Sequence, residues 1–163
     1  MQQTLIPDPT RSARFSPCRT YRYELWRRWG DGPYCMFICL NPSTADEILD
    51  DNTVRRCIRY SHAWGYDAFV MTNLFAYRAT DPRVMKAADD PEGDPDNLNT
   101  IVELAQTAGV VVAAWGGHGS YRRRDSIVRT ALGNIELKHL AKTQDGAPRH
   151  PLYLKKTLKP LPL

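Results

Sequence analysis

No hydrophobic run in this sequence approaches the roughly 18 apolar residues that a membrane-spanning helix requires. The first 17 residues, MQQTLIPDPTRSARFSP, also lack the apolar stretch of a secretory signal peptide. The chain contains neither internal repeats nor low-complexity tracts. These absences predict a cytoplasmic protein with an ordinary globular fold and no membrane partner.

Cysteine is scarce, with four residues, and no two of them form a Cys-x-x-Cys pair. Cys35 and Cys39 fall within one apolar run, and an intracellular domain of this size rarely depends on disulfides. Buried, reduced thiols are therefore expected in preference to a metal site or a disulfide. We also expect no cofactor.

Several common catalytic motifs are missing. The glycine-rich stretch WGGHGSYRRR lacks the Lys-Ser/Thr ending of a Walker loop and does not match the dinucleotide-binding fingerprint. No Ser-His-Asp elbow and no HExxH sequence occurs. The stretch remains a candidate anion site, because its glycines allow close backbone approach and Arg122 and Arg123 lie near the start of a predicted helix.

The chain has 163 residues, of which 42% are hydrophobic and 25% are charged. This length and composition predict a single domain over residues 1–163, with residues 1–19 as an irregular N-terminal segment. A monomer is favoured. The net charge of +4 is mild, but basic residues cluster at 55–59, 122–124 and 155–159. Each cluster is either a solvated surface or a contact for an anionic partner.

Hydrophobic periodicity predicts strands that alternate with helices. The expected strands cover residues 20–29, 34–41, 67–77, 109–119 and 135–143. The expected helices run from Asp51 or Asn52 to a stop at Gly65, from 97 to 108, and from about 120 to 132, with one short helix inside the connector 78–97.

This alternation implies parallel strands joined by right-handed crossovers. The first two strands are separated only by Gly30-Asp31-Gly32-Pro33, which favours an antiparallel hairpin between them. The predicted fold class is therefore α/β, a three-layer sandwich with a mainly parallel central sheet and an N-terminal antiparallel hairpin.

Polar residues follow the predicted core strands at the point where each strand ends. Asn41 follows the first, Asn73 the second, Trp115-Gly116 the third, and residues 142–150 the last. Ligands of such sheets bind outside the carboxyl ends of the strands. One binding site at this edge is therefore expected.

The side chains at this edge suit recognition of a polar ligand. The carboxamides of Asn41 and Asn73 can read the edge of a heterocycle or align a water, although an asparagine before a proline is also a common turn former. His150 is a candidate donor to an oxyanion or carbonyl, or a packed loop histidine. Asp51 is a candidate general base as well as a helix cap.

Five motifs, LNPSTAD, DDNTVRRC, NLFAYRATDP, AWG and HPLYL, resemble those of a bacterial and phage family, domain-of-unknown-function family 1643. The likeness covers nearly the whole chain from about residue 20. More distantly, the motif order resembles the uracil-DNA glycosylase superfamily, in the sequences at Asn41-Pro42-Ser43, Thr72-Asn73, Trp115-Gly116 and His150-Pro151. The sequence departs from that pattern where Ser43 replaces a glycine and Leu152 a serine.

The second resemblance implies a uracil-DNA-glycosylase-like fold and a role for each matching residue. Asn41 would position the attacking water, Asn73 would contact the base, and His150 would stabilise charge on the base carbonyl. Leu154 would occupy the position of the side chain that inserts into the duplex.

Two further groups of contacts are expected. The other substrate-binding residues, in the loops after the strands, are Pro42, Ser43, Thr44, Phe75, Arg78, Trp115 and Gly116. The phosphate-binding residues, all basic, are Arg55, Arg56, Arg122, Arg123 and Lys142.

The predicted function is recognition of a nucleobase in DNA or in a nucleotide, with hydrolysis of an N-glycosidic bond as the reaction. Two alternatives remain open at this stage. One is a non-catalytic nucleic-acid-binding module. The other is an enzyme of base modification or salvage that acts on free nucleotides and holds phosphate with residues 116–124.

Overall fold

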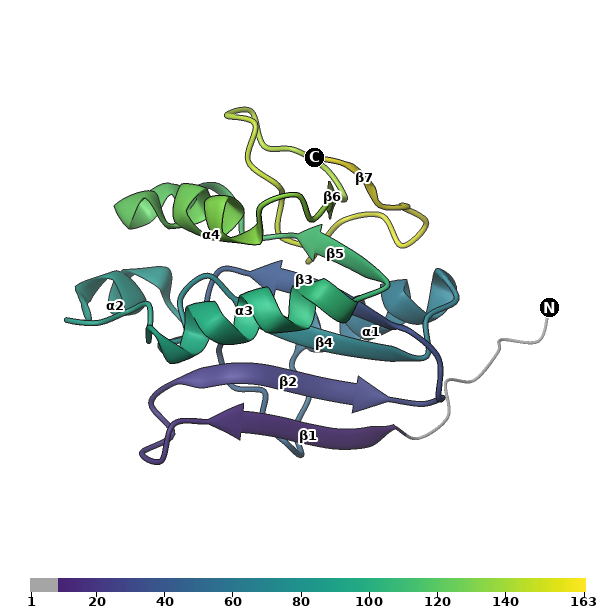
Figure 1. The fold of residues 1–163 in the computed structure, drawn as a ribbon, viewed down its shortest axis with the longest axis horizontal. Helices are drawn as coiled ribbons and strands as arrows, with labels where there is room; N and C mark the ends of the chain where they lie inside the picture. The colour runs from purple at the N-terminus through teal and green to yellow at the C-terminus, as the bar shows by residue number, and fades with distance from the viewer. Residues whose placement is uncertain (1–8) are drawn as a thin grey trace.

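The computed structural model describes residues 9–163 and folds them into one seven-stranded mixed sheet with four α-helices (Figure 1). The strands are β1 (Thr10–Phe15), β2 (Arg22–Arg28), β3 (Tyr34–Cys39), β4 (Ala68–Asn73), β5 (Val110–Ala113), β6 (Leu137–His139) and β7 (Leu161–Pro162). The helices are α1 (Asn52–Ala63), α2 (Pro82–Ala87), α3 (Asp96–Thr107) and α4 (Arg124–Leu132), with the 3-10 helix η1 (Gly117–Arg123) before α4.

The strand order is β1-β2-β4-β3-β5-β6-β7. The four central strands, β4, β3, β5 and β6, are parallel, whereas β1, β2 and β7 pair antiparallel with their neighbours. The expectation of a mainly parallel sheet therefore holds for the centre and not for the edges. No helix in residues 9–163 is long and apolar enough to cross a membrane.

The predicted hairpin between β2 and β3 is wrong, because β4 lies between these strands. The turn that joins them is held by Asp67, which precedes β4. Its carbonyl accepts from the backbone N–H groups of Trp29 and Gly30, and its carboxylate accepts from that of Gly32. β3 is buried along its whole length because it lies at the centre of the sheet, with a strand on each side.

An antiparallel pair does open the fold, but it consists of β1 and β2. Residues 10–15, which were expected to be irregular, therefore form a strand, and only residue 9 and residues 16–19 of that described segment lie outside it. Residues 1–8 fall outside the described part of the chain.

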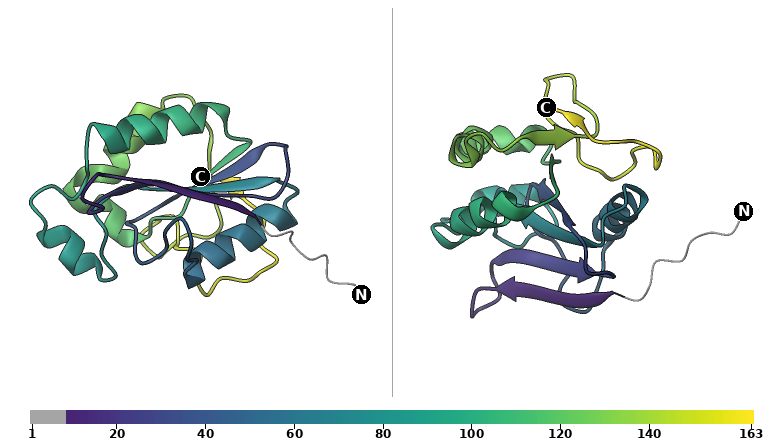
Figure 2. Two further views of the ribbon diagram at one scale, coloured as in Figure 1. Left: turned by 90° about the horizontal axis from the view of Figure 1, so that it is seen from below. Right: turned by 45° about the vertical axis from the view of Figure 1, so that its right-hand side comes forward.

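Helices cover both faces of the sheet, giving three layers: α3 and α4 on one face and α1 on the other (Figure 2). The side chains of β3 alternate between two buried clusters. Met36 and Ile38 pack with residues of α3 and α4, and Cys35 and Phe37 pack with residues of α1. Cys35, Cys39 and Cys57 are buried, as the sequence predicts, whereas the expectation of burial is wrong for Cys18, which is exposed.

The local signals for α1 are confirmed. The carboxylate of Asp51 accepts a hydrogen bond from the backbone N–H of Val54, so Asp51 is the N-cap, and Gly65 follows the helix with φ of 86°. The expected helix from about residue 120 begins later, at Arg124, because Arg122 and Arg123 adopt left-handed conformations and interrupt it.

Candidate functional site

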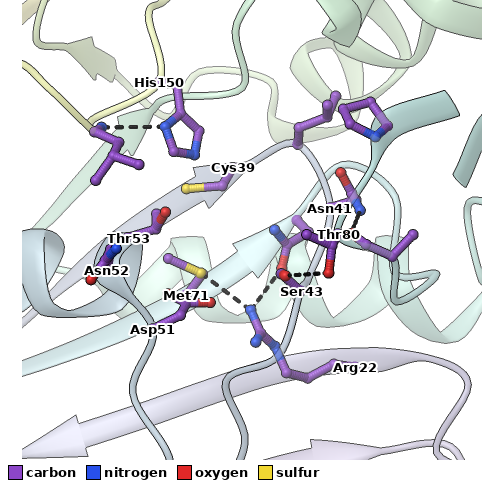
Figure 3. Close-up of a pocket in the computed structure, with 15 residues that line it drawn as sticks. Arg22, Cys39, Asn41, Ser43, Asp51, Asn52, Thr53, Met71, Thr80 and His150 are labelled. Atoms are coloured by element: carbon purple, nitrogen blue, oxygen red, sulfur yellow. Dashed lines mark hydrogen bonds between the residues drawn. The ribbon is translucent and has the colours of Figure 1, made fainter. Parts of the chain in front are cut away.

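A pocket of about 400 Å³ lies at the carboxyl ends of β3 and β4 (Figure 3). Its polar lining residues are Arg22, Asn41, Ser43, Asp51, Asn52, Thr53, Asn73, Thr80 and His150. The apolar side chains that complete it include Leu40, Met71 and Leu152. Most of the lining residues are therefore polar, and the apolar side chains among them are available to contact a ring.

Strand register explains why residues so far apart in sequence meet here. β3 and β4 run parallel with Cys39 opposite Asn73, so both chains leave the sheet at the same level. Beyond the strands the backbone N–H of Leu74 donates to the carbonyl of Cys39, and that of Ala79 to the carbonyl of Pro42. These bonds tie the two loops together and place Asn41 beside the end of β4.

The carboxamide of Asn41 is held in one orientation. Its Nδ2 donates to the carbonyl of Ala79 at 2.7 Å and to that of Pro42 at 3.3 Å. With both amide hydrogens used on the backbone, Oδ1 remains as a hydrogen-bond acceptor for a ligand or a water.

Asn73 presents the opposite character. Its side chain is fully buried, and its Oδ1 accepts a hydrogen bond from Nη2 of Arg22 at 3.4 Å. Nδ2 is buried and has no hydrogen-bond partner in the described part of the chain. An unpaired buried donor costs about 1–3 kcal/mol, so a donor of this kind inside a pocket indicates a ligand acceptor.

Arg22 places a positive charge beneath the pocket. Its side chain is 1% exposed, and it donates to the carbonyl of Ala45 and to Oδ1 of Asn73, but no carboxylate lies within ion-pair distance among residues 9–163. Burial lowers the pKa of the guanidinium to about 10, an effect that Asp51 opposes, so Arg22 is charged at neutral pH.

His150 stands at the mouth of the pocket, near the N-terminus of α1 (Figure 3). Its Nδ1 accepts a hydrogen bond from the backbone N–H of Leu152 at 3.2 Å. Burial lowers the pKa of this imidazole, and the carboxylate of Asp51 partly opposes that shift. At neutral pH the ring is therefore uncharged, with its proton on Nε2, where it can be donated to a ligand.

Asp51 serves the helix and the pocket together. Oδ1 caps α1, while the residue itself lines the pocket beside Asn52 and Thr53, the first two residues of the helix. The second carboxylate oxygen has no hydrogen-bond partner among residues 9–163. The helix N-terminus adds backbone N–H groups and a partial positive charge to this side of the pocket.

The pocket brings together five of the residues that the sequence analysis singled out: Asn41, Ser43, Asp51, Asn73 and His150. Pro42 is buried within the same loop, where its carbonyl accepts from Ala79. Thr44 and Arg78 line a neighbouring, separate depression with Arg19. That depression shares Ser43, Ala79 and Thr80 with the pocket.

Other predicted contacts lie in the core. Phe75 is fully buried against Tyr121, and Trp115 is 3% exposed and packs on Gly119. Neither lines the pocket. Gly116 contributes through its own backbone. Its N–H donates to the carbonyl of Pro148 at 2.7 Å and so anchors the segment that leads to His150.

The resemblance places Leu154 where a side chain would insert into the duplex, but in the structure this side chain is not exposed. Leu154 is 8% exposed and belongs to the cluster packed under α1. The turn after Pro151 turns its side chain inward, because Tyr153 takes a left-handed conformation with φ of 69°. The exposed side chain of this turn is Tyr153, with 87% of its surface accessible.

The predicted phosphate-binding residues divide into separate groups. Arg55 and Arg56 line a groove that borders the pocket. Arg122 and Arg123 line a different depression with Ile127 of α4, and no residue is common to that depression and the pocket. Lys142 is exposed on a loop closed by its bridge with Pro148.

Sequence reasoning missed Arg22, Asn52, Thr53 and Thr80. Arg22 carried no signal, because three arginines occur along β2 and nothing in the sequence shows which of them lines the pocket. Asn52 and Thr53 could have been predicted from the sequence, because a helix that begins just after a strand-end loop places its first residues at the same edge of the sheet.

Fold and pocket together define an α/β protein with a pocket at the carboxyl ends of its parallel strands β3 and β4. Residues 22–152 match the family described as "Protein of unknown function (DUF1643)", and the chain belongs to that family, as its motifs predict. Neither the search of curated proteins nor that of solved structures found a match.

Proposed function

We propose that this protein recognises a nucleobase in the pocket and hydrolyses its N-glycosidic bond, on a uracil-DNA-glycosylase-like fold. The observation that carries the proposal concerns Asn73 and Arg22. Nδ2 of Asn73 has no hydrogen-bond partner among the described residues, and the buried charge of Arg22 lies against Oδ1 of the same side chain. Together they favour a ligand atom that accepts a hydrogen bond and gains negative charge. The resemblance of the loop motifs to the glycosylase superfamily points in the same direction.

The reaction needs these electrostatic features. Breaking an N-glycosidic bond leaves negative charge on the departing base and positive charge on the sugar, so catalysis depends on donors placed where the negative charge develops. Nδ2 of Asn73 and Nε2 of His150 are such donors, and Arg22 strengthens the first by its hydrogen bond to Oδ1. A neutral His150 can donate without having to lose an ion pair.

The residues that activate the water lie on the other side of the pocket. Oδ1 of Asn41 is an oriented acceptor, and the free oxygen of Asp51 is a second one. A water held between acceptors has its lone pairs directed at the sugar carbon, and Asp51 is the group able to take the proton. The negative charge of Asp51 also favours the cationic sugar.

Base release from defined substrates tests the proposal. The protein is incubated with oligonucleotides that carry uracil, mismatched bases or modified pyrimidines, and with free nucleosides and nucleotides, and released base is measured by chromatography. Release is expected from at least one substrate, with a loss of about 100-fold or more in Asn41→Ala.

Asn99→Ala is the matched control, since Asn99 is exposed on α3 away from the pocket. It should release base at the wild-type rate. Absence of release from the whole panel refutes the reaction. Binding without release supports a non-catalytic recognition module that uses the same pocket.

A further inference from the structure

A basic groove of about 310 Å³ runs beside the pocket. Its lining residues are Asn52, Arg55, Arg56, Arg59, Leu152, Tyr153 and Lys156. We call this the α1 groove. Four of its residues are cations and none is acidic, although the chain as a whole carries 18 acidic residues against 22 lysines and arginines. The groove is therefore more basic than the chain as a whole.

Part of this charge is not used within the fold. Among residues 9–163, Arg59 and Lys156 have neither an ion pair nor a hydrogen bond, and Nη1 of Arg56 is buried with no partner. Two of the cations do have internal partners, since Arg55 donates to Asn52 and to the carbonyl of Asp50, and the guanidinium of Arg56 lies over the ring of Tyr60. Cations gathered without internal partners are complementary to an anionic chain.

Tyr153 gives the groove a second property. The ring is 87% exposed, and the residue adopts a left-handed conformation that bulky side chains rarely take. Exposure of a large ring and backbone strain both oppose folding, so together they point to a role in binding. An exposed aromatic ring among cations is the arrangement on which unstacked nucleobases stack.

The groove is continuous with the pocket. Asn52 and Leu152 line both, so the groove offers a path by which a polymer whose base occupies the pocket can leave it. The N-terminus of α1 lies at this junction, where its backbone N–H groups face an incoming phosphate. A free mononucleotide has no second base for Tyr153 and no further phosphates for the distant cations.

We propose that the α1 groove binds the DNA strand that flanks the base in the pocket, with phosphates on Arg56, Arg59 and Lys156 and a neighbouring base stacked on Tyr153. The inference rests on the proposed function for the identity of the pocket ligand. It adds that the substrate is a polynucleotide, and it assigns roles to Arg59, Tyr153 and Lys156, which are not among the site residues predicted from the sequence.

Binding is measured with the Asn41→Ala protein, so that no reaction consumes the probe. Fluorescence anisotropy follows a labelled single-stranded oligodeoxynucleotide over a series of salt concentrations, with the wild-type groove and with three variants of it. Tyr153→Ala should weaken binding by at least about fivefold, whereas Tyr153→Phe should not, because stacking needs the ring and not the hydroxyl. The double variant Arg59→Ala/Lys156→Ala should reduce the slope of log K against log salt by about 1.4.

Arg129→Ala is the charge-matched control, because Arg129 is exposed on α4, on the opposite face of the sheet from α1. Its salt slope should equal that of the wild-type groove. Circular dichroism confirms that each variant is folded. Heparin, a polyanion without bases, should bind independently of Tyr153, and a mononucleotide should compete poorly with the oligodeoxynucleotide.

Unchanged DNA affinity in both Tyr153→Ala and Arg59→Ala/Lys156→Ala overturns the inference, as does a mononucleotide that competes as well as the strand. Tighter binding of RNA than of DNA of equal length overturns the choice of partner. Groove-dependent binding without base release leaves this inference standing and defeats the proposed reaction. Base release from free nucleosides that does not depend on the groove supports the proposed reaction and overturns this inference.

Discussion

Replacing Arg22 by methionine should abolish ligand recognition while leaving the fold almost as stable as before. Arg22, Arg27 and Arg124 are the largest fully or nearly fully buried side chains of the described residues, and they provide an internal comparison. Arg27 pairs with Asp50 and Arg124 with Asp94, whereas Arg22 has no carboxylate partner. Only Arg22 lines the pocket.

The expected costs differ because the partners differ. Removing one member of a buried ion pair costs about 3–5 kcal/mol, so Arg27→Met and Arg124→Met should each lower the free energy of unfolding by about 3 kcal/mol, the lower end, since Asp50 and Asp94 are partly exposed. In Arg22→Met the carbonyl of Ala45 and Oδ1 of Asn73 each lose a donor, which together cost about 2 kcal/mol. Relief from burying a charge without an ionic partner offsets this loss, so the net change should stay within about 1 kcal/mol.

Urea denaturation at pH 7 measures these differences, and thermal melts should show shifts of about 6–12 °C for Arg27→Met and Arg124→Met but no more than about 4 °C for Arg22→Met. Base release or oligonucleotide binding is measured on the same samples. Arg22→Met should lose activity despite its stability. If Arg22→Met unfolds as readily as the other two variants, Arg22 is a structural residue and the reasoning is wrong.

The pKa of His150 is lowered by burial, so the folded protein binds this proton less readily than the unfolded chain does. The stability it provides is fully present above pH 6.5 and is lost as pH falls through the lower folded pKa. Urea titrations at pH 7 and pH 5 should thus show a smaller decline for His150→Gln than for the wild type. Leu154→Ala should cost about 3 kcal/mol in the same denaturation assay. Tyr153→Ala, at the exposed neighbour, should cost no more than about 0.5 kcal/mol. The thiol of exposed Cys18 has its pKa lowered to about 7 by its hydrogen bonds with Ser16 and Thr20, whereas burial raises the pKa of Cys35 to about 12. Iodoacetamide at pH 7.5 should therefore alkylate Cys18 alone in the folded protein, and mass spectrometry showing rapid labelling of Cys35 would contradict this.

Local signals located most of the helices and strands. Asp51 caps α1 as a short polar residue before an amphipathic run should, and Gly65 ends the helix region as a residue tolerant of positive φ. The uninterrupted apolar sequence of β3 correctly indicated a strand covered on both faces. Each of these features depends on contacts within a few residues or on one segment's own hydrophobicity.

Strand neighbours could not be read in the same way. The Asp-Gly turn suggested a hairpin, but β2 pairs with β1 and β4, and Asp67 from a distant segment holds the turn. Likewise Leu154 and Tyr153 are adjacent in sequence, and a left-handed residue decides which one is buried. These outcomes depend on competition between long-range contacts.

By itself the sequence determined the family, the α/β class, and the strand-end positions of Asn41 and Asn73, because motif and hydrophobic period are written in consecutive residues. Only the tertiary structure decided which donors and acceptors face the pocket. The carbonyl of Ala79 fixes Asn41 as an acceptor, and Arg22 fixes Asn73 as a donor, across 38 and 51 residues. A carboxamide has both characters, and its partners in the folded chain select between them.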